Sequence, residues 1–159
     1  MQEKSPPSDT RQALMRYAAN ILAARPYFSG RLREKLTLRA AKLNLSSAQE
    51  EIENIITDLK SNKFLDDRYL SQGYVRKELN KGWGPKIILL KLMRLGVERD
   101  LAQEALLTEA DLAHQKSAIA HYLPKIRRYD KRIQINKLFQ RGFNSAAVLG
   151  TFDSYASEG

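Results

Sequence analysis

The sequence has no cysteine, and this absence excludes thiol catalysis, disulfide frameworks and zinc or iron–sulfur sites built on thiolates. Proline and glycine are scarce, at 5 and 8 of 159 residues, so few positions interrupt a helix. The bulkiest aliphatic run, Ile87–Leu90, is far shorter than the roughly 20 residues of a membrane span, and residues 1–8 lack the apolar run of a signal peptide. We therefore expect a soluble, cytoplasmic protein that needs no membrane and no cofactor.

Positive charge is what the sequence has in excess, with 27 Lys and Arg against 18 Asp and Glu, or +9. Residues 1–62 contain ten Lys and Arg against seven Asp and Glu, residues 63–108 nine against six, and residues 109–159 eight against five. Each of these three segments therefore has a net charge of +3. An even excess along folded segments favours an extended surface attracted to nucleic acid or a nucleoprotein. The alternative is that the charge only keeps the protein soluble.

The first third of the sequence predicts three helices. Apolar residues recur at three- and four-residue steps from Asp9 to Ala24, and Pro26 ends this helix. Ser29 is expected to cap a second helix that continues toward Asn44. Ser47 begins a Ser-Ala-Gln-Glu capping box, in which the hydroxyl accepts a backbone N–H bond at the start of a third helix.

The remaining sequence repeats this organisation. Asp66 and Asp67 offer capping carboxylates for a helix, Pro85 suits the first position of the next helix, and Gly96 suits its end. Later helices are expected at 98–107, 110–125, 130–141 and 144–155.

An internal repeat is visible in the middle helix of each group. Lys-Leu pairs begin at Lys35, Lys91 and Lys137, which lie 56 and then 46 residues apart. We predict an all-α protein, an elongated array, curved or straight, of three tandem three-helix repeats. The predicted parts are a disordered N-terminal tail at 1–8, repeats at 9–62 and 63–108, and a third repeat with a short C-terminal tail at 109–159.

The middle repeat resembles the RecX family of bacterial recombination regulators. The residues that carry this resemblance are Phe64-Leu65-Asp66-Asp67, Val75-Arg76, Gly82-Trp83-Gly84-Pro85, Ile88, Leu92 and Gly96-Val97. The segments Leu32–Leu36 and Lys131–Phe143 resemble the outer repeats of the family. The sequence departs from the family at Ala40-Ala41, where a helix-ending glycine is usual.

The resemblance implies tandem three-helix repeats and a partner, the RecA recombinase filament on single-stranded DNA. Family members bind that filament and limit its extension or promote its disassembly, which restrains strand exchange and the SOS response. Some also bind DNA directly. We therefore expect a monomeric, non-enzymatic regulator of the filament.

The candidate binding residues are basic side chains and one tryptophan. They are Arg25, Arg31, Arg33 and Lys35 in the first repeat; Arg76, Lys77, Lys81, Trp83, Lys86, Lys91 and Arg94 in the second; and Lys125, Arg127, Arg128, Lys131 and Arg132 in the third. Five cations within eight residues repel one another unless a partner neutralises them, which favours binding at the last cluster. The alternative is a solvated face with cations at helix C-termini.

Other interpretations rest on single residues. An exposed Trp83 could stack on a base, whereas a buried one would anchor the joint between two helices, which we favour. His114 and His121 are two helical turns apart, about 10 Å, which is too far to share a metal. No nucleophile–base set is found, so no enzyme is predicted.

Two alternative functions stay open. The helices that flank Gly96 could form a helix–turn–helix that binds duplex DNA directly, without RecA. A helical adaptor for an acidic protein is the other alternative.

Overall fold

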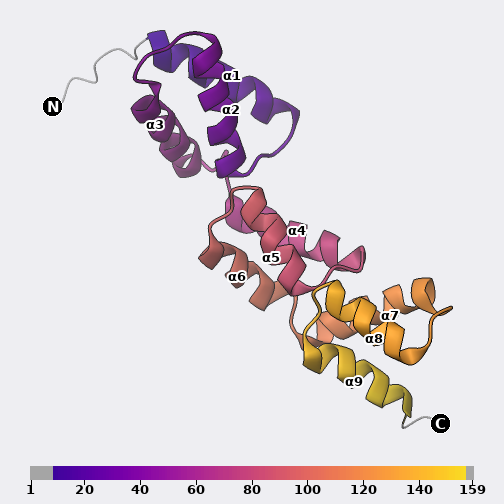
Figure 1. The fold of residues 1–159 in the computed structure, drawn as a ribbon. Coiled ribbons are helices and arrows are strands. Elements are labelled where there is room, and N and C mark those ends of the chain that lie inside the picture. The colour runs from indigo at the N-terminus through magenta and orange to yellow at the C-terminus, as the bar shows by residue number, and fades with distance from the viewer. Residues whose placement is uncertain (1–8, 157–159) are drawn as a thin grey trace. The chain divides into compact units, whose positions relative to one another are not determined.

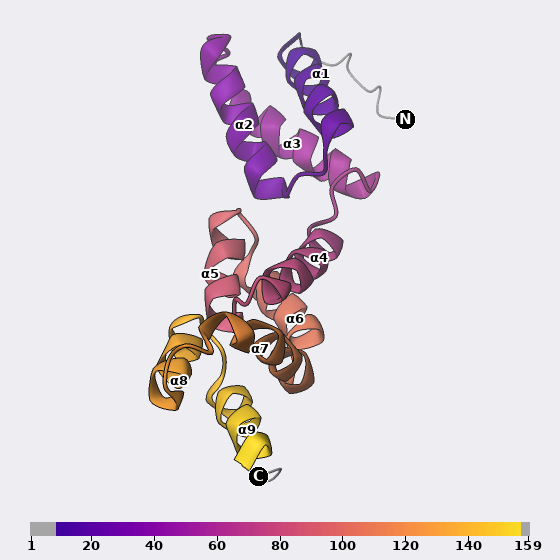
Figure 2. The same ribbon diagram turned by 90° about the vertical axis from the view of Figure 1, so that its right-hand side faces the viewer.

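The computed structural model describes the backbone of residues 9–156 and the side chains of residues 9–153, so the predicted tail at 1–8 and the last residues of the C-terminal tail lie outside it. Within this range the chain is helical and contains no strand, which confirms the all-α class (Figures 1 and 2). The helices are α1 (Asp9–Ala24), α2 (Ser29–Lys42), α3 (Ala48–Ser61), α4 (Asp67–Asn80), α5 (Pro85–Arg94), α6 (Arg99–Glu109), α7 (Leu112–Ile126), α8 (Lys131–Gln140) and α9 (Ser145–Ala156).

The chain divides into two compact units, Met1–Asp67 and Arg68–Gly159. In the first unit, α1, α2 and α3 all pack on one another. In the second unit, α5 packs on α6, and α7, α8 and α9 pack together. The boundaries of the three predicted repeats and the elongated shape stay predictions. Within the described residues, no helix is long and apolar enough to cross a membrane.

The core of the first unit comes from one apolar stripe on each helix. Leu14 and Ala18 of α1, Leu32 and Leu36 of α2, and the isoleucines of α3 are buried together. Their spacing of three or four residues places them on one face of each helix, as the sequence predicted. Among the described residues, none of the charged side chains of this unit is buried.

Among the described residues, five helices end in the same backbone turn, namely α2, α3, α4, α5 and α8, and three of them serve as examples. A left-handed residue follows each of α2, α5 and α8, namely Asn44 (φ 52°), Gly96 (φ 83°) and Gly142 (φ 91°). The next residue then donates its N–H to a carbonyl near the helix end, at 3.0 Å for Leu45, 3.1 Å for Val97 and 3.3 Å for Phe143. Asparagine tolerates this conformation better than most residues, so α2 runs past Ala40-Ala41 and ends at Lys42 without a glycine.

Two of the predicted serine caps are wrong. Ser29 is the first residue of α2, its hydroxyl is buried without a hydrogen-bond partner, and its N–H donates instead to Asp67 Oδ1 at 2.8 Å. Ser47 precedes α3 in a left-handed conformation and makes no side-chain cap. A capping box needs an extended backbone at that position. Aspartates do cap later helices, since Asp111 accepts the N–H of His114 and Asp130 accepts that of Ile133.

Within the second unit, the loop before α5 is bonded directly to the turn after α8. Gly84 N–H donates to the carbonyl oxygen of Arg141 at 2.7 Å, and Lys86 N–H donates to that of Gly142 at 3.1 Å. A Cβ atom on Gly84 would lie 2.2 Å from the nitrogen of Phe143, so only glycine fits at this crossing. We call residues 81–86 and 141–143 together the glycine joint.

Candidate basic binding surface

The predicted binding cations of the first unit are mostly engaged by neighbouring groups. Arg31 forms an ion pair with Glu34, with Nη1 2.9 Å from Oε2. Arg33 forms an ion pair with Glu53 of α3, with Nε 2.7 Å from Oε1. These carboxylates reduce the field that the two arginines present to a polyanion. The charges of these two arginines are therefore compensated within the unit.

Arg25 and Lys35 gather around one tyrosine. The Arg25 guanidinium donates a hydrogen bond to the Tyr27 hydroxyl at 3.0 Å and lies 4.7 Å from the ring centroid, and Lys35 Nζ lies 5.7 Å from it. The hydrogen bond from Arg25, and the positive charges of both cations, lower the pKa of Tyr27. The two side chains form a small basic cluster around the half-buried Tyr27.

In the second unit, Lys81 and Lys91 converge on a buried carboxylate. Glu78 accepts from Lys81 at 3.1 Å and from Lys91 at 2.6 Å, and its side chain is only 5% exposed. Burial alone would raise the pKa of Glu78, but the hydrogen bonds and charges of Lys91 and Lys81 outweigh burial and lower it. Lys91 of α5 therefore bonds to the end of α4, whereas Lys81 pairs with Glu78 within the same helix end.

The other predicted cations of α4 and α5 differ in their partners. Arg76 pairs with Glu109 of α6 at 2.8 Å. Lys77, Lys86 and Arg94 are exposed, and none of them forms an ion pair with a carboxylate of the described residues. Their charges face solvent and are available to a partner.

Trp83 is half-buried and lies among cations of the glycine joint. Lys91 Nζ is 4.3 Å and the Arg141 guanidinium carbon 3.9 Å from its ring centroid. Such distances are those of cation–π contacts. The indole is engaged inside the second unit, in line with the favoured interpretation that it anchors the helix joint.

Arg141 is the centre of this arrangement. Its guanidinium donates to the carbonyl oxygens of Gly82 and, at 3.0 Å, of Lys81, and it lies 4.3 Å from the centroid of Tyr122 on α7. Lys125 Nζ lies on the same tyrosine ring, 5.9 Å from its centroid. Lys91, Trp83, Arg141, Tyr122 and Lys125 thus alternate cation and ring from α5 to α7, and we call this series the cation–aromatic strip.

The strip connects two of the predicted basic segments. It places Lys91, Trp83 and Lys125, which were predicted as site residues from separate parts of the sequence, on one continuous line of contacts. The members that the prediction missed are Arg141 and Tyr122. A cation directly before the helix-ending Gly142 was the only local signal for Arg141, since its partners lie about sixty residues earlier.

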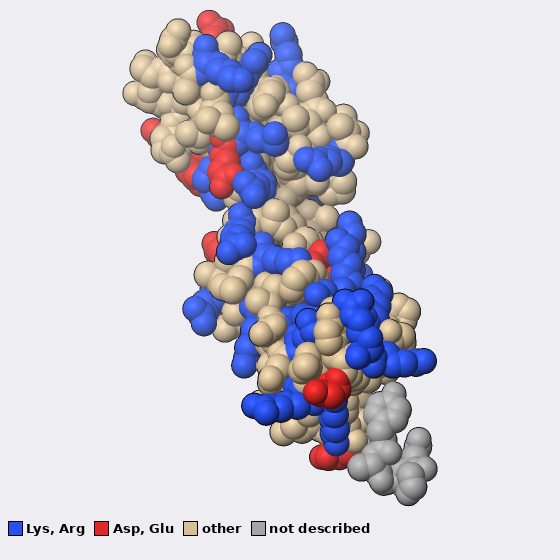
Figure 3. All heavy atoms as spheres, turned by 45° about the vertical axis from the view of Figure 1, so that its right-hand side comes forward, with Lys and Arg blue, Asp and Glu red and all other residues tan. Residues whose placement is uncertain are grey.

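The segment from α7 to α9 carries charge that no carboxylate compensates. Residues 112–153 contain eight Lys and Arg but only two Asp. Among the described residues none of these eight cations forms an ion pair with a carboxylate. Lys and Arg spread over the face of this unit that Figure 3 displays, with Asp and Glu confined to isolated spots.

Around the turn after α7, cations rest on rings rather than on carboxylates. Arg128 donates to the Tyr129 hydroxyl at 2.8 Å, and Lys137 Nζ lies 4.4 Å from the centroid of that ring. The hydrogen bond from Arg128 and the charges of both cations lower the pKa of Tyr129. Arg127, Lys131 and Arg132, which were predicted with them, are exposed beside this turn.

The acidic and histidine residues serve local structure. Asp67 receives the N–H of Ser29, and His114 Nδ1 lies 2.7 Å from Asp111 Oδ1, in the cap of α7. The backbone N–H bond from His114, together with the side-chain bond, lowers the pKa of Asp111. Within the described range no three His, Asp or Glu side chains are grouped so as to hold a metal ion.

The fold and this surface define the class of protein. It is an all-α protein that presents a basic surface on its second unit. The sequence pattern described as "RecX, second three-helix domain" matches residues 66–106. The proteins named Regulatory protein RecX from Salmonella heidelberg (strain SL476) and Serratia proteamaculans (strain 568) are 23% and 27% identical to this chain. The alignments cover 87% and 90% of this chain and 91% and 98% of those proteins.

The fold is shared with solved structures. The crystal structure of RecX from Lactobacillus salivarius matches with a TM-score of 0.74 at 21% identity and covers 92% of this chain and 96% of its own. A second crystal structure, of a regulatory protein RecX, matches with a TM-score of 0.72. The chain is thus similar to proteins named Regulatory protein RecX over about nine tenths of its length, which confirms the resemblance stated from its sequence.

Proposed function

We infer that this protein is a non-enzymatic regulator that binds the RecA filament on single-stranded DNA in the cytoplasm. It limits extension of the filament or promotes its disassembly, and so restrains recombination and the SOS response. The observation that carries this proposal is the likeness to proteins named Regulatory protein RecX over about nine tenths of the chain. That likeness includes both units and not only the central segment.

The basic surface supports the same proposal. A filament of protein on DNA is a long polyanion, and uncompensated cations increase both the rate and the strength of association with such a partner. The cations of α7–α9 lack carboxylate partners among the described residues, so their charge is available to the filament. Exposed Lys77, Lys86 and Arg94 add to it within the same unit.

The direct test is the ATP hydrolysis of RecA on single-stranded DNA with increasing amounts of this protein. We expect hydrolysis to fall as protomers are lost from the filament or no longer added. The inhibition should weaken as salt concentration rises, because phosphate contacts release counterions. Unchanged hydrolysis at saturating protein would contradict the proposal.

The helix–turn–helix alternative is less well supported by the charges of α6. In that arrangement α6 would be the recognition helix, but it carries one cation, Arg99, and three carboxylates, Asp100, Glu104 and Glu109. Carboxylates on a helix that enters the major groove repel the phosphates on either side. Tight, sequence-dependent binding to duplex DNA without RecA would restore this alternative.

A further inference from the structure

An apolar groove of about 560 Å³ opens on the second unit, between α5, α6 and the first turns of α7 and α9. Pro85 and Leu89 line it from α5, Leu106 and Leu107 from α6, and Leu112 from α7. Leu107 is 80% exposed and Leu112 is also exposed, so the groove leaves leucine surface in contact with water. Burial of such surface against a partner is favourable in proportion to its area.

The outer face of α5 continues this apolar surface. Leu89 lines the groove, and Leu90 and Met93 lie beside it on the same side of the helix and are both exposed. Single exposed apolar residues are ordinary on a protein surface, but a contiguous group of them marks an interaction site. We call Leu89, Leu90, Met93, Leu107 and Leu112 together the α5–α6 apolar face.

Two cations lie at the ends of the α5 part of this face. Lys86 lies four residues before Leu90 and Arg94 four residues after it, so the two cations are about 12 Å apart along the helix axis. Both are exposed, and neither forms an ion pair with a carboxylate of the described residues. A partner that complements them carries carboxylates on either side of its apolar surface.

Two carboxylates of this region are engaged in other contacts. Asp111 lines the groove, but its Oδ1 accepts the N–H of His114 at 2.9 Å in the cap of α7. Glu104 of α6 forms an ion pair with Arg68 at 2.9 Å. The free charges beside the apolar face are therefore those of the two cations on α5.

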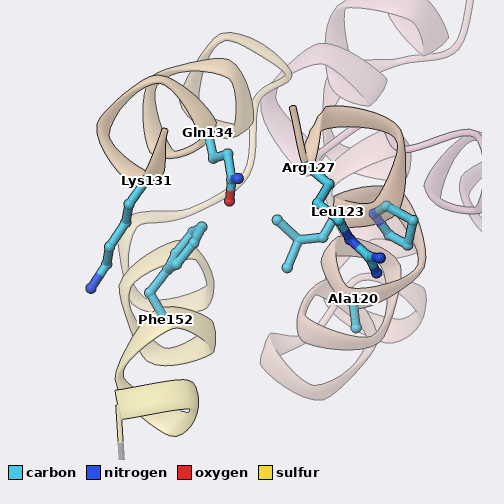
Figure 4. A pocket seen from close by; sticks show the side chains of 7 residues that line it. Ala120, Leu123, Arg127, Lys131, Gln134 and Phe152 are labelled. Atoms are coloured by element: carbon cyan, nitrogen blue, oxygen red, sulfur yellow. The ribbon is translucent and has the colours of Figure 1, made fainter. Parts of the chain in front are cut away.

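Another hollow of the same unit lacks this combination. It measures about 490 Å³ between α7, α8 and α9, and Leu123, Lys131 and Phe152 are among the residues that line it. Figure 4 shows Lys131 on the far side of Phe152 from Leu123, so its ammonium group does not face the hollow. The α5–α6 apolar face is thus the better docking surface.

We propose that the α5–α6 apolar face binds an amphipathic acidic helix of a partner protein. Apolar side chains of that helix enter the groove beside Leu107 and cover Leu90, and its carboxylates reach Lys86 and Arg94. An amphipathic helix in an apolar groove is a recurring mode of peptide recognition. The inference goes beyond the proposed function, because the filament contact rests mainly on the cations of α7–α9, whereas this face receives a second protein without the filament.

The experiment measures binding of the full chain, without RecA or DNA, to a fluorescein-labelled peptide of about 15 residues, which is long enough to form a helix. Leucine occupies every third or fourth position of the peptide, and glutamates line both sides of this stripe. A second peptide has the same residues in scrambled order, and a third has lysine in place of glutamate. We expect the first peptide to bind at least about tenfold more tightly than either of the others. Equal affinity for all three, or no binding to any, would overturn the inference.

A polar substitution locates the binding in the groove. Glutamine is nearly as good a helix former as leucine, so Leu107→Gln removes an exposed apolar contact at little cost to α6. We expect this variant to bind the acidic peptide at least about fivefold more weakly. Leu38→Gln, at a 64% exposed position of α2 in the first unit, is the matched control and should keep the parent affinity. Circular dichroism of both variants should match the parent, and equal affinities of the two variants would contradict the inference.

A double substitution tests the charge complementarity. Lys86→Gln combined with Arg94→Gln should reduce the preference for the glutamate peptide over the lysine peptide by at least about fivefold, because both free cations of the face are removed. An unchanged preference would show that the charge of the partner is read at another place, and would overturn the inference.

Two further measurements separate this inference from other occupants. A dimer of the parent chain in analytical ultracentrifugation that Leu107→Gln dissociates would show that a second copy covers the face, and would overturn the inference. Leu107→Gln should inhibit RecA hydrolysis as the parent does, and a loss of inhibition would assign the face to the filament instead of a second partner. A parent that fails to inhibit RecA contradicts the proposed function alone, because peptide binding is measured without RecA.

Discussion

The α1–α3 unit and the α7–α9 segment both carry many Lys and Arg residues, but the groups that contact these side chains differ between the two regions. In α1–α3, Arg11, Arg31 and Arg33 pair with carboxylates of the same unit, as Arg33 does with Glu53 at 2.7 Å, although Arg25, Lys35 and Arg39 lie over tyrosine rings. In α7–α9, cations lie against aromatic rings and carbonyl oxygens, as Arg141 does with Tyr122 and Gly82. A ring orients a cation without cancelling its charge, whereas a carboxylate cancels it.

This difference is invisible in the net charge of each third of the sequence, which is +3 throughout. The last third contains five acidic residues, but Glu109 pairs with Arg76 of α4, and Asp111 caps α7 beside His114. Asp130 caps α8, and none of the lysines and arginines of this third forms an ion pair with a carboxylate among the described residues. The positive charge that a region presents to a partner depends on which groups its carboxylates contact, and not on the number of carboxylates.

The largest expected effect comes from breaking the glycine joint. Gly84→Ala would place a Cβ 2.3 Å from the backbone carbon of Gly142, and backbone cannot yield as a side chain does. We expect the second unit to lose about 3 kcal/mol or more of stability, as overpacked sites do. Hydrogen exchange should show faster exchange in α4–α9 and unchanged exchange in α1–α3.

Gly73→Ala is the matched control for that substitution. Gly73 lies within α4, and the nearest atom to an added Cβ is the end of the Arg76 side chain at 3.7 Å. Alanine is the better helix former, so this variant should be more stable by about 0.5–1 kcal/mol. Equal stability of the two variants would contradict the tight crossing at Gly84.

The next effect concerns Arg141 as the centre of the cation–aromatic strip. Arg141→Ala removes charge-assisted hydrogen bonds to two carbonyl oxygens, and we expect a loss of about 2 kcal/mol. Urea denaturation followed by the fluorescence of Trp83, the single tryptophan, measures this loss at the joint itself. Arg132→Ala, at an exposed position of α8, should change stability by no more than about 0.5 kcal/mol.

Charge-reversal variants compare how much the cations of the α1–α3 unit and of the α7–α9 segment contribute to filament binding. Changing Lys125, Arg127, Arg128 and Arg132 together to glutamate should weaken binding to the RecA filament by at least about tenfold, because uncompensated cations are lost. Reversing Arg31 and Arg33 should have a smaller effect, since their charges already face Glu34 and Glu53. Titration of filament binding at fixed salt, with helicity checked, gives both values; equal losses would refute the contrast between the regions.

The smallest effect is a pH dependence at Glu78. Its pKa is lower in the folded chain than in the unfolded chain, so the unfolded chain binds more protons as the medium becomes acidic. The stabilisation from this carboxylate is present at neutral pH and declines as the pH falls through the usual glutamate range, about 4.3, and below it. Denaturation of the parent and of Glu78→Gln across this range should show a weaker dependence on pH in the variant.

Much of the fold was predictable because helices are local. The apolar spacing of Leu32 and Leu36 indicates a helix, and Pro85 and Gly96 indicate where the helix between them begins and ends, as α2 and α5 confirm. The caps at Ser29 and Ser47 were wrong, because Asp67, distant in sequence, takes the N–H of Ser29, and because Ser47 adopts a left-handed conformation. A capping motif specifies a possible bond, and packing decides whether the backbone can make it.

The candidate site was predictable only as a set of residue types. The sequence by itself determined the all-α class, the RecX resemblance, the glycines of the joint and the excess of cations. The tertiary structure decided which cations keep their charge, since Arg76 meets Glu109 across 33 residues and Arg141 meets Gly82 across 59. Helical periodicity acts over three or four residues, whereas charge compensation acts over a few ångströms between whichever side chains the packing brings together.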